Sequence, residues 1–192
     1  MPRMSQEELN EIIEERIPKI GFSIPADIRS RIIRLSQGLP GYVHLLGQLT
    51  LRGAISRRSM SINDDDFNSS LSQVLEKADY MARQAYHKAI SSANADNKYK
   101  EVLLACAMAE SNELGSFYAG AVRDPYSRIR GRDMNIPNFS TNLANLCSDE
   151  RGPALVKSGK PKRYQYRFKN PLVQPLTIII GVSEGMITLD EV

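Results

Sequence analysis

The 192-residue sequence predicts a mainly α-helical protein, in which a helical bundle is followed by a smaller helical domain that ends in a β-hairpin. Three observations predict this fold class. Apolar residues recur at helical spacing through most of the chain. Prolines and glycines fall between these periodic stretches, where they end one helix or begin the next. After about residue 153 the spacing changes to alternation, which is typical of strands with one buried face.

The composition is that of a folded domain, because 42% of the residues are hydrophobic and 24% are charged. The formal net charge of +3 is unevenly distributed. Residues 1–96 carry 12 basic and 12 acidic side chains, whereas residues 119–170 carry 11 basic and 4 acidic ones. An anionic partner is therefore expected to bind the C-terminal half.

Neither cysteine has the setting of a metal ligand or of a disulfide framework. Cys106 and Cys147 lie in apolar helical stretches without a C-x-x-C motif. The N-terminus lacks the apolar core of a signal peptide, and the longest apolar run, 176–182, is far shorter than the roughly 20 residues of a membrane span. We expect a cytoplasmic protein with reduced thiols, no bound metal and no contact with a membrane.

The first half reads as a bundle of four helices. The expected helices cover residues 5–18, 25–38, 40–54 and 63–91. Ser5 and Glu8 have the spacing of a capping box, and Asn63 or Asp64 is expected to cap the fourth helix. The polar segment Ser91–Asn97 predicts a domain boundary. We therefore expect one domain over residues 1–92 and a second over 97–182, with a flexible tail from 183 to 192.

The second half predicts three helices followed by a β-hairpin, which is the order of a winged helix. The helices are "KYKEVLLACAMAE", a short one that begins at Pro125, and a third that begins at Pro137. The strands are "ALVKS" and "KRYQYRF". In the second strand one face carries aromatic residues, expected in the core, and the other carries Arg163, Gln165 and Arg167. After Pro171 we expect a helical turn and then an irregular apolar segment.

The corner between the second and third helices resembles a motif of a known family. The stretch "SQGLPGYVHLLGQL" contains S-x-G-x-P, with Gly38, Leu39 and Pro40 at the corner. A small helical bundle with this corner, followed by a winged helix, resembles the C-terminal portion of AAA+ or STAND-type ATPases, particularly the initiator clade that includes origin-recognition proteins. The N-terminal "PRMSQEELNEIIEERI" is similar to the exit from the P-loop domain of such ATPases.

This resemblance implies a lid-type helical bundle over residues 1–92, in which Gly38, Leu39 and Pro40 contact nucleotide bound by a preceding P-loop domain of the same protein. ATP and Mg²⁺ would be held by that domain. Many relatives place an arginine after this motif, whereas this sequence has Gly41, and we considered Arg34 or His44 as substitutes. No G-x-x-x-x-G-K-[ST] motif occurs, so the chain alone is not expected to hydrolyse ATP and is interpreted as a fragment of a longer ATPase.

The winged helix implies a recognition helix that begins at Pro137 and faces duplex DNA. Its outward positions are Asn138, Ser140, Thr141, Asn142 and Asn145. The helix has no cation, so phosphate contacts would come from residues before it and from the hairpin. The residues expected before it are Arg128, Arg130 and Arg132, and those on the hairpin are Lys157, Lys160, Lys162, Arg163 and Arg167.

The sequence thus favours a chain that couples the nucleotide state of an attached ATPase domain to binding of double-stranded DNA. Two alternatives stay open. In one, the winged helix docks onto protein subunits and regulates the ATPase or its assembly. In the other, the chain is a free-standing winged-helix transcription regulator whose N-terminal helices dimerise. No catalytic residue is predicted, because the acids at 64–66 are explained by capping and by the helix dipole.

Overall fold

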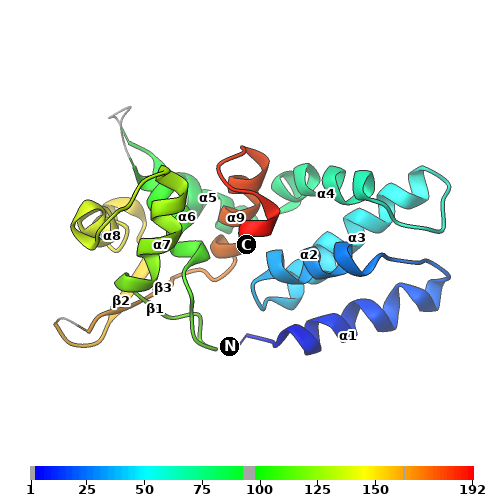
Figure 1. Cartoon of the computed structure of the whole chain (residues 1–192), viewed down its shortest axis with the longest axis horizontal. Helices are drawn as coiled ribbons and strands as arrows, with labels where there is room; N and C mark the ends of the chain where they lie inside the picture. The colour runs from blue at the N-terminus through cyan, green and yellow to red at the C-terminus, as the bar shows by residue number, and fades with distance from the viewer. Residues whose placement is uncertain (1–2, 93–97, 162) are drawn as a thin grey trace. The chain divides into compact units, whose positions relative to one another are not determined.

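The computed structural model describes residues 3–92, 98–161 and 163–192, and over these residues the chain is mainly helical with a small three-stranded antiparallel sheet (Figure 1). The chain divides into two compact units. We call Arg3–Ala78 with Thr188–Val192 the N-terminal unit, and Asp79–Ile187 the C-terminal unit. Of the helices in the described part of the chain, none is both long and apolar enough to cross a membrane.

The N-terminal unit is a helical bundle. Its elements are α1 (Gln6–Arg16), the 3₁₀ helix η1 (Pro18–Ile20), α2 (Ala26–Ser36), α3 (Pro40–Ser56), α4 (Asp64–Lys77) and the 3₁₀ helix η4 (Leu189–Glu191). The capping box of Ser5 and Glu8 begins α1 as predicted. Helix α3 packs against α1, α2 and α4, and side chains with almost no exposure, such as Ile32, Leu46 and Phe67, form the core between them. The predicted helical spacing therefore identified the buried faces.

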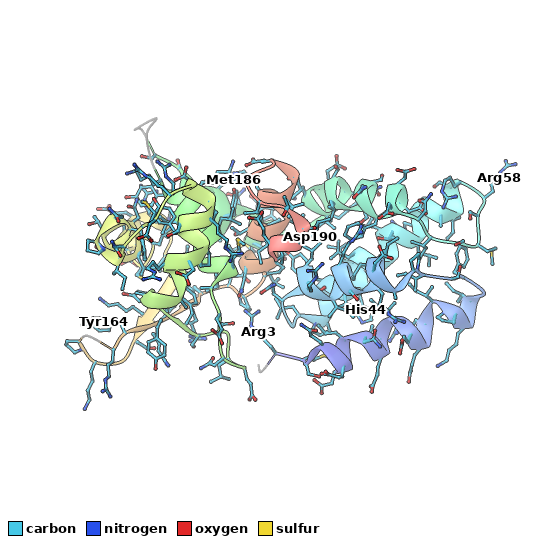
Figure 2. All side chains as sticks on the ribbon, in the orientation of Figure 1. Arg3, His44, Arg58, Tyr164, Met186 and Asp190 are labelled. Atoms are coloured by element: carbon cyan, nitrogen blue, oxygen red, sulfur yellow. The ribbon has the colours of Figure 1, made fainter. Side chains whose placement is uncertain are left out.

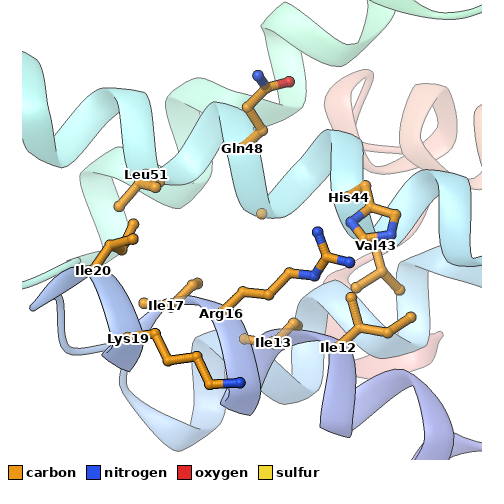
Figure 3. Close-up of a pocket in the computed structure, with 11 residues that line it drawn as sticks. Ile12, Ile13, Arg16, Ile17, Lys19, Ile20, Val43, His44, Gln48 and Leu51 are labelled. Carbon is orange, nitrogen blue, oxygen red and sulfur yellow. The ribbon is translucent and has the colours of Figure 1, made fainter.

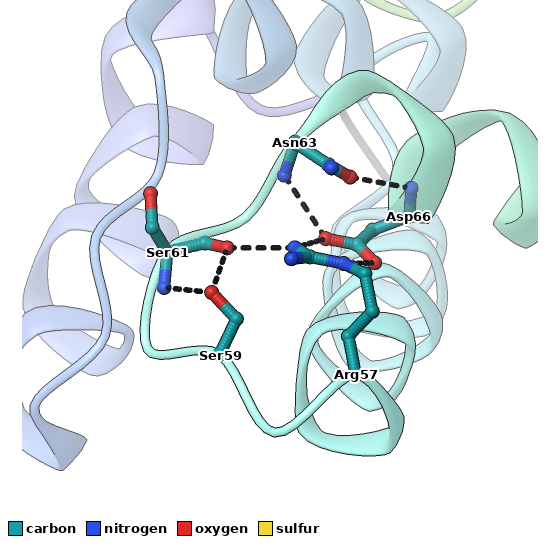
Figure 4. A network of polar contacts seen from close by, with 5 residues as sticks. All are labelled: Arg57, Ser59, Ser61, Asn63 and Asp66. Atoms are coloured by element: carbon teal, nitrogen blue, oxygen red, sulfur yellow. Dashed lines mark hydrogen bonds and ion pairs between the residues drawn. The ribbon is translucent and has the colours of Figure 1, made fainter.

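A network of polar contacts holds the connection between α3 and α4 (Figure 4). The side chain of Asp66 is 4% exposed, and the guanidinium of Arg57 donates to its two oxygens at 3.1 and 2.7 Å. The backbone N–H of Asn63 donates to Asp66 at 3.0 Å, and the Asn63 side chain accepts from the Asp66 N–H at 3.1 Å. Arg57 also donates to the carbonyl of Ser61 at 2.9 Å. One carboxylate thus closes a capping box and joins two helices.

The single helix expected over 63–91 is two helices. Helix α4 ends at Lys77, Ala78 leaves the helical conformation with ψ 150°, and α5 (Tyr80–Ile90) begins after it. The carboxylate of Asp79 accepts from the N–H of Ala82 at 2.8 Å and so caps the new helix. A short acidic side chain competes with the helical backbone for hydrogen bonds, which explains the break.

The compact units also divide at this break, between Ala78 and Asp79, rather than at residues 92–97. Helix α5 packs against α6 and α9 and so belongs to the C-terminal unit. Residues 93–97 of the expected boundary lie outside the described residues.

In the C-terminal unit the other elements surround a central helix, α6 (Tyr99–Met108). Besides α5 and α6, its elements are β1 (Phe117–Tyr118), α7 (Ala119–Arg130), the 3₁₀ helix η2 (Ile136–Asn138), α8 (Ser140–Asn145), the 3₁₀ helix η3 (Asp149–Arg151), β2 (Leu155–Ser158), β3 (Gln165–Phe168) and α9 (Val173–Ser183). Helix α6 packs against α5, α7, α8 and α9, and all six residues from Val102 to Ala107 are buried. This apolar helix is the core of the unit.

Two helices of this unit begin differently from the prediction. Helix α7 starts at Ala119, so Pro125 lies inside it and not at its start. An internal proline costs about 3 kcal/mol of helix stability, but Val122, Pro125 and Tyr126 form the buried face of α7 and burial outweighs that cost. The expected helix from Pro137 is divided into η2 and the short α8, because Phe139 between them has φ −133° and ψ −2°.

The segment after the hairpin is a complete helix and not the irregular segment that was expected. Pro175 lies in the first turn of α9, where the missing N–H costs no intrahelical hydrogen bond. Gly181 allows α9 to approach α6, because a Cβ there would lie 2.8 Å from the Leu104 methyl groups. The expected flexible tail is also structured in part, since Ile187 is 4% exposed and Thr188 forms a capping box with Glu191.

The sheet has the strand order β1-β3-β2, with both pairs antiparallel. Strands β2 and β3 form the predicted hairpin, whereas the two-residue β1 was not predicted. Phe117 pairs with Tyr166, and their rings stack with centroids 6.1 Å apart. Leu155 pairs with Phe168, and both are buried. Of the predicted aromatic face, Tyr166 and Phe168 therefore pack into the core, whereas Tyr164 lies before β3 and is half-buried.

Candidate nucleic-acid interface and helix corner

Exposed cations gather on the β2–β3 hairpin. Lys157 lies in β2, Lys160 in the turn, Arg163 just after the turn, and Arg167 in β3, and all four are exposed. The predicted Lys162 lies outside the described residues. The loop between the strands extends beyond them, and Tyr164 marks its return toward β3 (Figure 2). The hairpin thus groups several of the residues that were predicted to bind phosphates, and these side chains are exposed to solvent.

The register places these cations on two faces of the hairpin. Lys157 pairs with Tyr166 and therefore lies on the face that carries the aromatic residues, at its outer edge. Its Nζ lies 4.2 Å from the centroid of the Tyr164 ring, which is a cation–π contact. Arg167 pairs with Val156 on the opposite face. Cations therefore lie on both faces of the hairpin, whereas the sequence analysis placed Arg163 and Arg167 on one face and assigned no face to Lys157.

One residue of the outer face was missed by the sequence analysis. Tyr118 of β1 pairs with Gln165, and its hydroxyl accepts from the Gln165 side chain at 2.9 Å. Tyr118 is 54% exposed, so an aromatic ring lies on the same face as Arg167. A strand of two residues has no alternation that a sequence pattern could detect.

Helix α8 presents only part of the predicted recognition surface. Ser140 and Thr141 are exposed, whereas Asn142 and Asn145 are half-buried. The side chain of Asn145 donates to the Tyr99 hydroxyl at 2.8 Å, so it serves the packing of α8 on α6. Asn138 is exposed in η2, but its side-chain oxygen accepts from the Asn135 N–H at 2.7 Å. The amide groups that were expected to read bases are thus partly engaged within the chain.

Internal contacts also occupy part of the basic excess. Arg130 donates to both oxygens of Glu101 at 2.8 Å. Arg151 lies 3.3 Å from the centroid of the Tyr99 ring and donates to the carbonyls of Ala89 and Ser91 at 2.9 and 2.6 Å. Of the predicted cations before α8, Arg128 and Arg132 are exposed. Among the predicted cations, more exposed ones therefore lie on the hairpin than before α8.

The corner of Gly38, Leu39 and Pro40 lies in the N-terminal unit. Gly38 has φ 76°, Leu39 is 8% exposed, and Pro40 is the first residue of α3. The N–H of Met4 donates to the carbonyl of Gly38 at 3.0 Å. A Cβ at Gly38 would lie 2.6 Å from the Cβ of Arg3. The close backbone approach that this glycine permits is thus used by the N-terminal segment of the same unit.

Arg3 takes part in this contact. Its guanidinium donates to the carbonyl of Gln37, which itself adopts a left-handed conformation with φ 51°. Burial lowers the pKa of Arg3 from its ordinary value, because desolvation disfavours the charged form. The corner is therefore a packed element in which the Gln37 carbonyl accepts from a partly buried cation.

The two residues considered as substitutes for an arginine at position 41 line different surfaces. Arg34 lies beside a hollow between α1 and α2 that is also lined by Glu7, Glu11 and Glu14. His44 is exposed and lines a groove between α1 and α3. The geometry does not bring these two side chains to a common site.

The described residues contain no group of three or more His, Cys, Asp or Glu side chains that could hold a metal ion. Cys106 is buried and Cys147 half-buried, and burial raises the pKa of both thiols. Neither thiol has the depressed pKa of a reactive cysteine.

Comparisons with known proteins yield no relative. No protein-family model matches the chain, and no curated protein and no solved structure is significantly similar to it.

Proposed function

We propose that the C-terminal unit is a winged helix that binds double-stranded DNA through its β2–β3 hairpin, and that the chain is the lid and winged-helix portion of an AAA+-type ATPase. The order α6, β1, α7, α8, β2 and β3, with the strand order β1-β3-β2, supports the first part of the proposal. In this arrangement α8 is the candidate recognition helix and the hairpin is the wing.

The observation that carries the proposal is the cluster of exposed cations on the hairpin. Lys160 and Arg163 flank its turn, and Lys157 and Arg167 extend from opposite faces. A projecting hairpin with cations on both faces suits a DNA groove, because phosphates of both strands border each groove. Most of the binding free energy would then come from phosphate contacts, with little discrimination between sequences.

The proposed role of the N-terminal unit follows from the resemblance of its corner. Gly38, Leu39 and Pro40 would lie against ATP and Mg²⁺ held by a P-loop domain of the same protein. Coupling requires that DNA binds with different affinity in the two nucleotide states. The packing of Arg3 and Met4 on Gly38 supports a connection between the entering segment and the corner.

Fluorescence anisotropy of a labelled DNA duplex over a salt series tests DNA binding. The test variant combines three substitutions on the hairpin: Lys160→Glu, Arg163→Glu and Arg167→Glu. The control variant changes the net charge by the same amount, but on exposed residues of the N-terminal unit. It combines Arg52→Glu, Arg58→Glu and Lys77→Glu. We expect saturable binding that weakens with salt. The slope of log K against log salt should fall in magnitude by about 0.9 for each lost phosphate contact, so by roughly 3 in the test variant.

An equal loss of affinity in both triple variants would contradict the proposal, because it would mean that net charge alone drives the binding. Absence of binding at low salt would contradict it as well. Translation of the genomic sequence upstream tests the ATPase part separately: a P-loop motif supports it, and a stop codon directly before the chain contradicts it.

A second candidate is a protein-docking winged helix that regulates the ATPase or its assembly. The observation in its favour is that α8 carries no cation and that Asn145 is engaged with Tyr99. It predicts DNA binding that is weak and independent of the hairpin residues. The third candidate, a transcription regulator that dimerises through its N-terminal helices, predicts a stable dimer in sedimentation equilibrium.

A further inference from the structure

A groove of about 450 Å³ lies between α1 and α3 in the N-terminal unit (Figure 3). Its wall on α1 and η1 runs from Ile12 to Ile20, and its wall on α3 runs from Val43 to Leu51. Most of the lining side chains are apolar, and Ile20 at one end is 54% exposed. At a rise of 1.5 Å per residue the α3 wall is about 12 Å long, which corresponds to about two turns of a helix.

Gly47 has no side chain that would fill this groove. It lies in the middle of α3 and lines the groove, and apart from the local α3 backbone no atom lies within 4 Å of the position that a Cβ would occupy. A glycine inside a helix costs about 1 kcal/mol relative to alanine. No neighbouring group in this unit uses the space, so the position leaves room for another molecule to approach the α3 backbone.

The charged side chains that line the groove are the cations Arg16 and Lys19, and none of its lining residues is acidic. The side chain of Arg16 extends across the groove toward α3 (Figure 3). Within the described residues Arg16 forms no ion pair, and Lys19 has only an exposed contact with Glu15 at 3.6 Å, which contributes little.

Three of the five acidic residues of α1, Glu7, Glu11 and Glu14, line the hollow toward α2 and not the groove. Glu8 and Glu15 line neither, so no carboxylate of α1 lines the groove beside Arg16. An occupant of the groove must therefore combine an apolar surface with a carboxylate within reach of that guanidinium. The length of the groove and its two helical walls suit a helix, since a third helix packs naturally into the furrow between two others.

We propose that the α1–α3 groove binds an amphipathic helix of a partner protein, with apolar side chains at positions i, i+4 and i+7 and acidic residues beside them. The apolar side chains would cover Ile12, Ile20 and Leu51, and the partner backbone would pass over Gly47. One acidic side chain would pair with Arg16. This docking site is independent of DNA binding by the hairpin.

Titration of the full chain with labelled synthetic peptides tests the docking site. A panel of helical peptides of about 14 residues carries leucines at this spacing. In one series the flanking residues are glutamates, and in the other they are lysines. The protein variants are Gly47→Leu, which fills the groove, and Arg16→Glu. Their controls are Gly41→Leu, on the same helix with equally open space at its Cβ, and Arg58→Glu, which does not line the groove.

We expect saturable binding of glutamate peptides and at least about tenfold weaker binding of the lysine series. Gly47→Leu and Arg16→Glu should each weaken binding about tenfold or more, and the two controls should change it less than about twofold. Circular dichroism melting shows which variants are folded, and a folded Gly47→Leu that binds normally would overturn the proposal. So would failure of the whole panel to bind, or equal binding of the two series.

Two other occupants are distinguished by the same proteins. Sedimentation equilibrium without peptide would reveal a dimer that Gly47→Leu disrupts, in which case the groove binds a second copy and the proposal fails. Saturable binding of dodecanoate together with no peptide binding would assign the groove to a small apolar anion, which also overturns it.

Discussion

Gly38 has two separate reasons to be glycine. Its φ of 76° lies in the left-handed region, where a side chain costs about 1–2 kcal/mol. In addition, a Cβ would meet Arg3 at 2.6 Å and the Met4 carbonyl oxygen at 3.2 Å. Gly41, three residues later, has helical geometry and open space around its Cβ position.

We therefore expect Gly38→Ala to lower the free energy of unfolding by about 2 kcal/mol, since both the strained φ and the contact with Arg3 act against it. Gly41→Ala should raise the free energy by up to about 1 kcal/mol, because alanine favours the helix. Urea unfolding followed by circular dichroism measures both changes. Equal effects of the two substitutions would show that the corner is not held by this contact.

The charge of Asp66, which holds the α3–α4 connection, makes the free energy of unfolding depend on pH in the acid range. The hydrogen bonds from Arg57 hold the pKa of Asp66 below its ordinary value, and the Asn63 N–H lowers it further, while burial opposes both. The carboxylate is thus charged in the folded chain at pH values where it would be protonated in the unfolded chain. Its contribution to stability is present above the ordinary pKa and is lost as the pH falls through the lower folded value.

Asp66→Asn should consequently be less stable than the unmodified protein at neutral pH, with the difference shrinking as the pH falls below the ordinary pKa of 3.8. Unfolding free energies of both proteins, measured across the acid range, give this difference directly. Other carboxylates titrate in both proteins, so their effects cancel in the subtraction. A difference that stays constant with pH would mean that the charge of Asp66 contributes nothing.

At the scale of elements, the break between α4 and α5 depends on a helix cap. Asp79 is the N-cap residue of α5, and its side chain accepts from the Ala82 N–H. Residues 64–90 have helical spacing on both sides of the break, so the spacing alone does not reveal it. The cap at Asp79 fixes the start of α5, and α5 belongs to the C-terminal unit, which begins at the same residue.

Removing the cap with Asp79→Ala should cost about 1 kcal/mol, whereas Asp79→Asn, which keeps a side-chain acceptor, should cost only a few tenths. Urea unfolding of the two variants distinguishes a cap from a charge effect. If the alanine and asparagine variants are equally destabilised, the charge of Asp79 matters more than its hydrogen bond.

In the β2–β3 hairpin, strand register determines on which face each charged side chain lies. Its alternation correctly placed the side chains of Tyr166 and Phe168 in the core. The position of Lys157 beside Tyr164 depends on which residue of β2 pairs with which residue of β3, and a shift of one residue would reverse it. The proposed DNA contact therefore follows from strand register as well as from composition.

At the scale of the whole molecule, the chain consists of two compact units with separate cores. Ile32 is fully buried in the N-terminal unit, and Ile178 is fully buried in the C-terminal unit. Because each core is formed by its own helices, a cavity in one core removes contacts mainly from that unit.

Ile32→Val and Ile178→Val should each cost about 1 kcal/mol. Amide hydrogen exchange read by mass spectrometry should show faster exchange chiefly in the unit that carries the substitution. Uniform acceleration over both units by either variant would show that the chain unfolds as one cooperative body.

The sequence by itself determined the helical class, the capping box at Ser5, a helix cap at Asn63 or Asp64, the apolar faces, the hairpin and the excess of basic residues in the C-terminal half. These features depend on residues close together along the chain, where helical periodicity, alternation and capping act locally. Local patterns also led to wrong expectations at Pro125 and after Pro171. Pro125 lies inside α7 because its burial outweighs the usual effect of proline, whereas Pro175 lies in the first turn of α9, where proline costs no intrahelical hydrogen bond.

Only the tertiary structure decided which polar groups remain available for a partner. Contacts between residues far apart in the sequence occupy several of these groups. Arg130 pairs with Glu101, Asn145 donates to Tyr99, and Gly38 packs against Arg3. The open α1–α3 groove likewise arises from the packing of two helices around Gly47. Such contacts depend on three-dimensional proximity, which residue spacing does not encode for distant segments.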